Sequence, residues 1–526
     1  MKIQIKKEHT LFLCVLGIII ILNLIWCVKK SDMFIDEIYT YGLSNSYYTP
    51  FIKDATENGT LINARLTRED FMNYLTVNKG EQFSFASVYY NQTQDAHPPL
   101  YYMFLHLISS FFPGSYSKWL GLSLNIVFYL ITNLLLYQVA RMILRSEKSA
   151  ALAVLLYGTS YGGLSTALMI RMYILLTLFT VAFFWVILKL YQGNTQKSLY
   201  ALVTVVMFLG MFTQYFFVIF AFFISAVYCL RELMRKRIKN VIWYAAAAFL
   251  GLGLFYVSYP YILNHLFADT LVSGQTVVSN VHDLAGMCLS IYSFVMQTIM
   301  SYKIPCYLLP VLVIAGIVLH KKVFQAYLAA FDERDSSAIA MTVAVGLTIF
   351  VTAVVSPVTA LRYVYNVLPF VAVGIVYVAE AVWRDWERYA PAVIRVSALL
   401  CIFQGMKDVP FYIDNIPQAR YEIMAEYADC PCICLDDDHN KPITQNMLLL
   451  MTFPEIFVTD DFLGEETQEY LRDKETDRGI ILMIDTSEIK SGYNAQEILS
   501  EIEETLGYQY QPLDTATKEI FVLSAK

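Results

Sequence analysis

The sequence predicts an α-helical polytopic membrane protein with about 11–13 transmembrane helices and a small extracytoplasmic α/β domain at its C-terminal end. Hydrophobic residues make up 57% of the 526 residues, and mean hydropathy is +0.49. Only 16% of residues are charged, against about 25% in soluble domains. Residues 407–526 differ from the rest, because they hold 25 acids and 9 bases. Soluble, fibrous, disordered and nucleic-acid-binding classes are excluded.

Residues 1–406 contain the apolar stretches that predict the membrane domain. A helix needs about 20 apolar residues to cross a bilayer. The first stretch follows three lysines and lacks a small-residue cleavage site, so we interpret it as a retained anchor. The twelve candidate stretches run approximately over residues 10–28, 99–112, 118–140, 149–168, 172–191, 198–213, 214–230, 241–263, 304–320, 337–357, 362–383 and 391–406.

Orientation follows from the basic loops, because cytoplasmic loops are enriched in Lys and Arg. The loops beginning near Arg141, Lys189, Arg231 and Lys321 are each separated by two stretches, so they share the cytoplasmic face. The segments around Arg171, Gln214, 264–303 and Arg362 then lie outside, as does the tail. Three stretches precede Arg141, whereas a cytoplasmic N-terminus requires an even number. Either one stretch is re-entrant, which gives eleven passes, or one hides a second crossing, which gives thirteen.

The acids of the membrane domain gather in one outer loop, residues 29–97, which holds nine of the twenty. The hydrophobic stretches contain almost none. Ion-coupled transporters place carboxylates near the bilayer midplane. This distribution therefore favours chemistry at the outer interface over ion-coupled transport.

The tail, residues 407–526, alternates between strand-like and helix-like segments. The runs CICL, EIFVT, GIILMID and EIFVLSA have the β-branched and aromatic content of strands. The runs ITQNMLLLMTF, EETQEYLRDK and NAQEILSEIEETL resemble helices. This order predicts a small α/β domain.

Two adjacent carboxylates, Asp36 and Glu37, follow the first span in the run FIDEIYTY. Burial against the membrane surface would raise the pKa of either carboxyl and make it a better base. The alternative is a helix N-terminus, where acids are favoured by the helix dipole, with interfacial tyrosines beside it. Taken alone, the pair favours this structural alternative.

Further candidates lie where the chain meets the membrane again. His97 precedes two prolines in DAHPPLYY, which suit a first helical turn and place the imidazole at a positive helix end. Arg171 with Tyr173, and Arg362 with Tyr363, form two outer Arg–Tyr pairs. A guanidinium binds phosphate bidentately, although a lone interfacial Arg is more often a snorkelling anchor.

Together and in this order, FIDEIYTYG, DAHPPLYYMFLHLISSFF, RMYILLTLF and LRYVYNVLPF resemble the GT-C superfamily of membrane glycosyltransferases. The likeness is to family 39, which includes protein O-mannosyltransferases and aminoarabinose transferases. It implies a sugar donor carried on polyprenyl phosphate, an extracytoplasmic acceptor (protein, glycan or lipid), and a multi-pass location in a cell membrane, which we expect to be bacterial. It also implies Asp36 as the base with Glu37 beside it. His97, Arg171 and Arg362 match positions near the donor.

Inverting transfer from a sugar phosphate needs one base and fixed positive charge, and it needs no acid for the leaving group. One acidic cluster with outer cations fits this requirement. The charge around Asp36 leaves room for a divalent metal, although no ligand set is visible in the sequence. Two alternatives remain open: a transporter or flippase that binds lipid phosphate without chemistry, and a catalytically silent relative whose tail is an assembly or sensor module.

Overall fold

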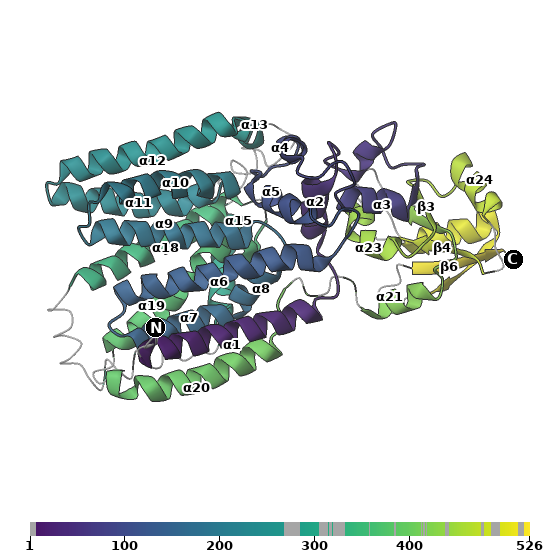
Figure 1. The fold of residues 1–526 in the computed structure, drawn as a ribbon. Helices are drawn as coiled ribbons and strands as arrows, with labels where there is room; N and C mark the ends of the chain where they lie inside the picture. Colours follow the sequence, from purple (N-terminus) through teal and green to yellow (C-terminus); the bar gives the residue numbers. More distant parts are fainter. Residues whose placement is uncertain are drawn as a thin grey trace. The chain divides into compact units, whose positions relative to one another are not determined.

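The computed structural model describes residues 7–267, 284–303, 314, 318, 332–356, 358–382, 386–411, 413, 416, 418–436, 441–474, 478–484, 495–513 and 520–525. The chain divides into two compact units (Figure 1). The first unit comprises Met1–Lys29, Asp95–Tyr101 and Gly121–Phe411. The second comprises Lys30–Gln94, Tyr102–Leu120 and Tyr412–Lys526. The outer loop, which we expected within the membrane domain, thus clusters with the tail.

Apolar helices build the first unit. In the described ranges, seven helices are long and apolar enough to cross a membrane, or eight if the bent pair α7–α8 is one span. The predicted stretch 304–320 lies outside the described residues apart from two positions, so the total of 11–13 stays a prediction. The elements are α1 (Lys7–Lys29), α6 (Lys118–Ile143), α7 (Glu147–Thr159), α8 (Tyr161–Leu168), α9 (Tyr173–Tyr191), α10 (Lys197–Thr213), α11 (Phe217–Met234), α12 (Ile238–Ser258), α13 (Ile262–Phe267), α15 (Leu284–Met300), α18 (Glu333–Val355), η2 (Leu361–Val367), α19 (Leu368–Val382) and α20 (Trp386–Lys407).

The apolar stretch at 99–112 forms only a short helix, α5 (Leu100–Ser109). Ten residues rise about 15 Å, half the thickness of a bilayer core. Its His106 Nδ1 lies 2.8 Å from the carbonyl oxygen of Ser44, so this helix packs within the second unit. Two spans, α1 and α6, therefore precede Arg141, which is the even number that a cytoplasmic N-terminus requires.

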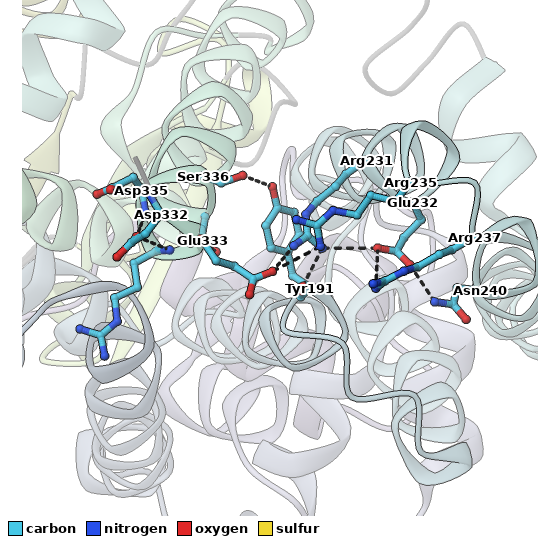
Figure 2. A network of polar contacts seen from close by, with 12 residues as sticks. Tyr191, Arg231, Glu232, Arg235, Arg237, Asn240, Asp332, Glu333, Asp335 and Ser336 are labelled. Atoms are coloured by element: carbon cyan, nitrogen blue, oxygen red, sulfur yellow. Dashed lines mark hydrogen bonds and ion pairs between the residues drawn. The ribbon is translucent and has the colours of Figure 1, made fainter. Parts of the chain in front are cut away.

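A polar network ties the ends of α9, α11 and α18 together (Figure 2). The guanidinium of Arg231 donates to the carbonyl oxygen of Tyr191 at 2.6 Å, stacks on the Tyr191 ring, and pairs with Glu232 and Glu333. Arg145 lies 3.6 Å from Asp335 at the same end. The basic loops near Arg141, Lys189 and Arg231, which were predicted to share one face, thus gather at one end of the helix bundle, whereas Lys321 lies outside the described residues.

The second unit contains a mixed six-stranded sheet in the order β1-β3-β2-β4-β6-β5. Strands β3, β2 and β4 are parallel, and the remaining pairs are antiparallel. Its core includes Ile433, Phe457, Tyr470, Leu482 and Leu523. The strands are β1 (Arg65–Thr67), β2 (Cys432–Leu435), β3 (Glu455–Thr459), β4 (Ile480–Met483), β5 (Tyr508–Pro512) and β6 (Ile520–Ala525). The helices are α2 (Ile35–Asn45), η1 (Ile52–Ala55), α3 (Arg68–Leu75), α4 (Phe85–Thr93), α5, α21 (Gln418–Ala425), α22 (Lys441–Gln445), α23 (Met447–Leu450), α24 (Glu465–Asp473), α25 (Ala495–Glu501) and η3 (Ile502–Leu506).

The four predicted strands and three predicted helical segments of the tail are all present, and the α/β class is confirmed. Strand β5 was not predicted, and neither was β1, which comes from the outer loop. Arg65 of β1 pairs with Phe457 of β3, and Asn63 N donates to Val458 O at 2.8 Å. The sheet is therefore built from two distant parts of the chain.

Candidate functional site

A cationic cluster lies in the first unit where the chain enters α5. His97 Nδ1 is 2.7 Å from Asp95 Oδ2, and Arg171 Nη2 is 3.5 Å from the same ring nitrogen. One nitrogen cannot donate to Asp95 and accept from Arg171 at once. The short contact is therefore the hydrogen bond, and Arg171 is a neighbouring cation. The structure thus brings together His97 and Arg171, which are 74 residues apart in the sequence.

Helix α6 supports the turn that carries Arg171. Asn125 on α6 donates to the carbonyl oxygens of Ala167 and Met169 at 3.0 and 2.7 Å. The Tyr101 hydroxyl in turn donates to Asn125 Oδ1 at 2.7 Å. Arg171 is only 6% exposed. A buried side chain on a braced turn is pre-positioned for a ligand, as an anion site requires.

Two tyrosines and a second histidine extend the cluster. Tyr215 Oη is 2.9 Å from His265 Nδ1, and the ring of Tyr259 lies 5.8 Å from that of His265. The Tyr259 hydroxyl donates to His97 O at 3.5 Å. Burial, together with the charge of Asp95, raises the pKa of Tyr215 above its usual value. The sequence predicted only an outer turn at Tyr215 and no role for Tyr259 or His265, because the proximity of the three depends on how α10, α12 and α13 end in space.

The two Arg–Tyr pairs also meet. The rings of Tyr173 and Tyr363 lie 6.5 Å apart, edge to face, and Tyr365 is 6.0 Å from Tyr173 on the same side. The Arg362 guanidinium is 5.4 Å from the centre of the Tyr363 ring. Tyr173 is 2% exposed. Helix α9 separates this aromatic end from the polar network at Tyr191 by 19 residues, or about 28 Å. The predicted outer segments around Arg171 and Arg362 therefore share one end of the bundle, opposite the polar network at Tyr191.

The electrostatics of the cluster favour an anion. Burial raises the pKa of Asp95, but the positive charge of His97, its hydrogen bond and the charge of Arg171 outweigh burial and lower this pKa to about 2. Asp95 is thus ionised at neutral pH and aligns His97 beside Arg171. The guanidinium of Arg171, next to His97, can donate to a phosphate oxygen.

Asp36 and Glu37 belong to the second unit and lie in the first turn of α2. Glu37 is fully buried, pairs with Lys30 at 2.9 Å, and accepts a 2.8 Å hydrogen bond from Phe34 N. Asp36 is partly exposed. The helix N-terminus that the alternative interpretation predicted is present, and Glu37 caps it. In the parts of the chain that the structure describes, no three His, Cys, Asp or Glu side chains are grouped to hold a metal ion.

Residues 96–261 match a family model described as dolichyl-phosphate-mannose-protein mannosyltransferase. This segment, about a third of the chain, contains His97, Arg171 and Tyr173. No curated protein sequence matches the chain.

Solved membrane transferases are similar to the chain in fold. ArnT from Cupriavidus metallidurans bound to undecaprenyl phosphate matches with a TM-score of 0.52 and 12% identity, over 97% of each chain. Its apo structure matches at 0.51 with 12% identity, over 98% of this chain and 97% of that one. The oligosaccharyltransferase AglB from Archaeoglobus fulgidus, in complex with an inhibitory peptide and a dolichol-phosphate, has a TM-score of 0.46 and 10% identity, over 90% and 70%. The likeness to AglB is weaker than that to ArnT, and at 12% identity the likeness to ArnT shows the fold alone. The GT-C resemblance and the helical membrane fold are confirmed.

Proposed function

We propose that this membrane protein of GT-C fold transfers a hexosyl or pentosyl group from a polyprenyl-phosphate carrier to an extracytoplasmic hydroxyl acceptor, with inversion. The observation that carries the proposal is the largely buried cluster of Asp95, His97 and Arg171, because both His97 and Arg171 fall within the segment that matches the mannosyltransferase model. The ArnT structure of the same fold holds undecaprenyl phosphate, which supports a lipid-linked phosphate as donor.

In the proposed reaction, the carboxylate of Asp36 accepts the proton of the acceptor hydroxyl. The acceptor oxygen forms a bond to the anomeric carbon while the bond from that carbon to the phosphate oxygen breaks. The leaving phosphate keeps the electron pair and needs no proton, because it is stable as an anion. Arg171, His97 and Arg362 stabilise the charge that grows on it.

The two adjacent carboxylates take different roles in this proposal. Glu37 is fully buried and neutralised by Lys30, so its lone pairs are committed to the ion pair and the helix cap. Asp36 is partly exposed on the same turn and is the carboxylate that an acceptor can reach. We therefore assign the base to Asp36 and a positioning role to Glu37.

The test is sugar transfer by the purified protein in lipid nanodiscs, with a panel of labelled polyprenyl-phosphate sugars as donors. Asp36→Asn should lower kcat at least about a hundredfold, since a positioned base contributes 10²–10⁴-fold. Asp54→Asn is the matched control, because Asp54 is an exposed carboxylate that caps a short helix in the same loop.

Full turnover by Asp36→Asn would disprove the assignment of the base. If the wild-type protein moves the labelled lipid across the bilayer but never releases its sugar, the protein is a flippase rather than a transferase.

A further inference from the structure

The tail holds the chain segment that precedes Asp36. Ser31 N donates to Ile413 O at 3.1 Å. Asp32 is 3% exposed and accepts two hydrogen bonds from the tail, one from Ile416 N at 2.8 Å and one from the Tyr421 hydroxyl at 2.9 Å. All of these residues belong to the second unit.

The same segment is fixed from its other sides. The Lys30 ammonium and the Glu37 carboxylate form a 2.9 Å ion pair with both side chains fully buried. Lys118 donates to the carbonyl oxygen of Lys30. Glu37 also caps the first turn of α2 through Phe34 N. The turn from Lys30 to Glu37 is therefore held by contacts at its first and last residues, and Asp36 directly precedes the last residue.

Asp32 has no part in the proposed chemistry, yet its burial is costly. Burial raises the pKa of the Asp32 carboxyl, whereas its hydrogen bonds with Met33, Tyr421 and Ile416 lower it. Burial of a carboxyl costs free energy, which its hydrogen bonds to neighbouring groups must offset. Both oxygens of Asp32 accept hydrogen bonds from the tail, so these hydrogen bonds hold the Lys30–Glu37 turn against the tail.

We propose that Ile413, Ile416 and Tyr421 of the tail brace the Lys30–Glu37 turn, and that Asp32 and Tyr421 are positioning residues for the Asp36 carboxylate. The proposal rests on the proposed function, because it assumes that Asp36 is the base. It gives the acidic tail a role within the reaction rather than one in assembly or sensing. Displacement of a catalytic group by about 1 Å costs about a hundredfold in rate, so loss of one bond of the brace is measurable.

The experiment compares Tyr421→Phe with Tyr427→Phe in the nanodisc transfer assay. Both changes remove one hydroxyl from the same part of the tail, but the Tyr427 ring contacts Arg478 rather than Asp32. Tyr421→Phe should lower kcat about three- to tenfold and leave KM for the donor unchanged, because the donor phosphate contacts are proposed in the first unit. Asp32→Asn should lower kcat similarly. The double variant should be no worse than the more impaired single variant, since both single changes act on the same hydrogen bond between Asp32 and Tyr421.

Equal kcat values for Tyr421→Phe and Tyr427→Phe would overturn the proposal. A raised donor KM with unchanged kcat would do so as well, and so would a lowered unfolding temperature with unchanged kcat. Asp36→Asn in the same series separates the two proposals. If Asp36→Asn is inactive while Tyr421→Phe is normal, only the brace fails. If Asp36→Asn is fully active, the base assignment fails and the brace fails with it.

Discussion

Replacement of Asp95 by Asn tests the electrostatics of the cationic cluster. The pKa of Asp95 falls from 3.8 to about 2 because His97 and Arg171 outweigh the effect of burial. Each tenfold change in proton affinity corresponds to about 1.4 kcal/mol, so the folded state favours the ionised carboxylate by about 2 kcal/mol. Both Asp95 and His97 are less than one-fifth exposed, so solvent screening is modest. Asp95→Asn keeps the shape and should lower the free energy of unfolding by about 2 kcal/mol at pH 7.

The pH dependence has a definite sign. A carboxyl whose pKa is lowered in the folded state stabilises the protein fully above its unfolded value of 3.8, and this contribution is lost as pH falls through about 2. Reversible unfolding in mixed micelles, at several pH values from 7 to 2, measures the difference between wild type and Asp95→Asn. The difference should shrink below pH 4 and should be at least halved in a His97→Gln background. A difference below about 0.5 kcal/mol at pH 7, or one that is unchanged at pH 2, would refute the reasoning.

Two further predictions concern cations. Lys30→Met leaves the Glu37 carboxylate buried without its ion-pair partner and should lower the free energy of unfolding by about 3–5 kcal/mol. Lys30→Met combined with Glu37→Leu should recover most of this loss, and an equal loss in the double variant would contradict the ion-pair explanation. Arg171→Lys keeps the charge but loses the planar fork, so it should raise donor KM about tenfold in the transfer assay. Arg235→Lys, in the polar network at the other end of the bundle, is its control and should leave KM unchanged.

The membrane helices could be predicted where an apolar run exceeds the thickness of a bilayer, as in α1, α6 and α9. Where apolar residues serve a protein core instead, the sequence left two span counts open. The stretch 99–112 is as apolar as a span, yet α5 ends at Ser109 and buries Leu105 within the protein. Helix α15 is a 17-residue apolar helix in a segment that we expected to be an outer loop, and it is shorter than the helices that qualify as spans. Hydrophobicity does not distinguish lipid from protein as the surrounding medium.

Contacts between residues far apart in the sequence could be predicted only where counting the membrane spans places both residues at the same end of the bundle. Counting spans placed Arg171 and Arg362 at one end of the bundle, and their neighbours Tyr173 and Tyr363 are in contact there. The hydrogen bond between His97 and Asp95 joins residues that are two apart in the sequence. The position of Arg171 next to His97, in contrast, depends on a turn 74 residues further along the chain. Strand β1 has only three residues, which is too short a pattern to predict a strand, and its local sequence does not identify β3 as its partner.

The pairing of β1 with β3 also sets an order of events during synthesis. Arg65 must wait for Phe457, which leaves the ribosome about 390 residues later. At 5–20 residues per second, that delay is about 20–80 seconds. Throughout this interval the outer loop lacks its neighbouring strand. Asp32 lacks its tail donors until Ile416 and Tyr421 have been made, shortly before Phe457. The second unit can close only after the helices between its two parts have been made, so the turn that precedes Asp36 gains its tail contacts late in synthesis.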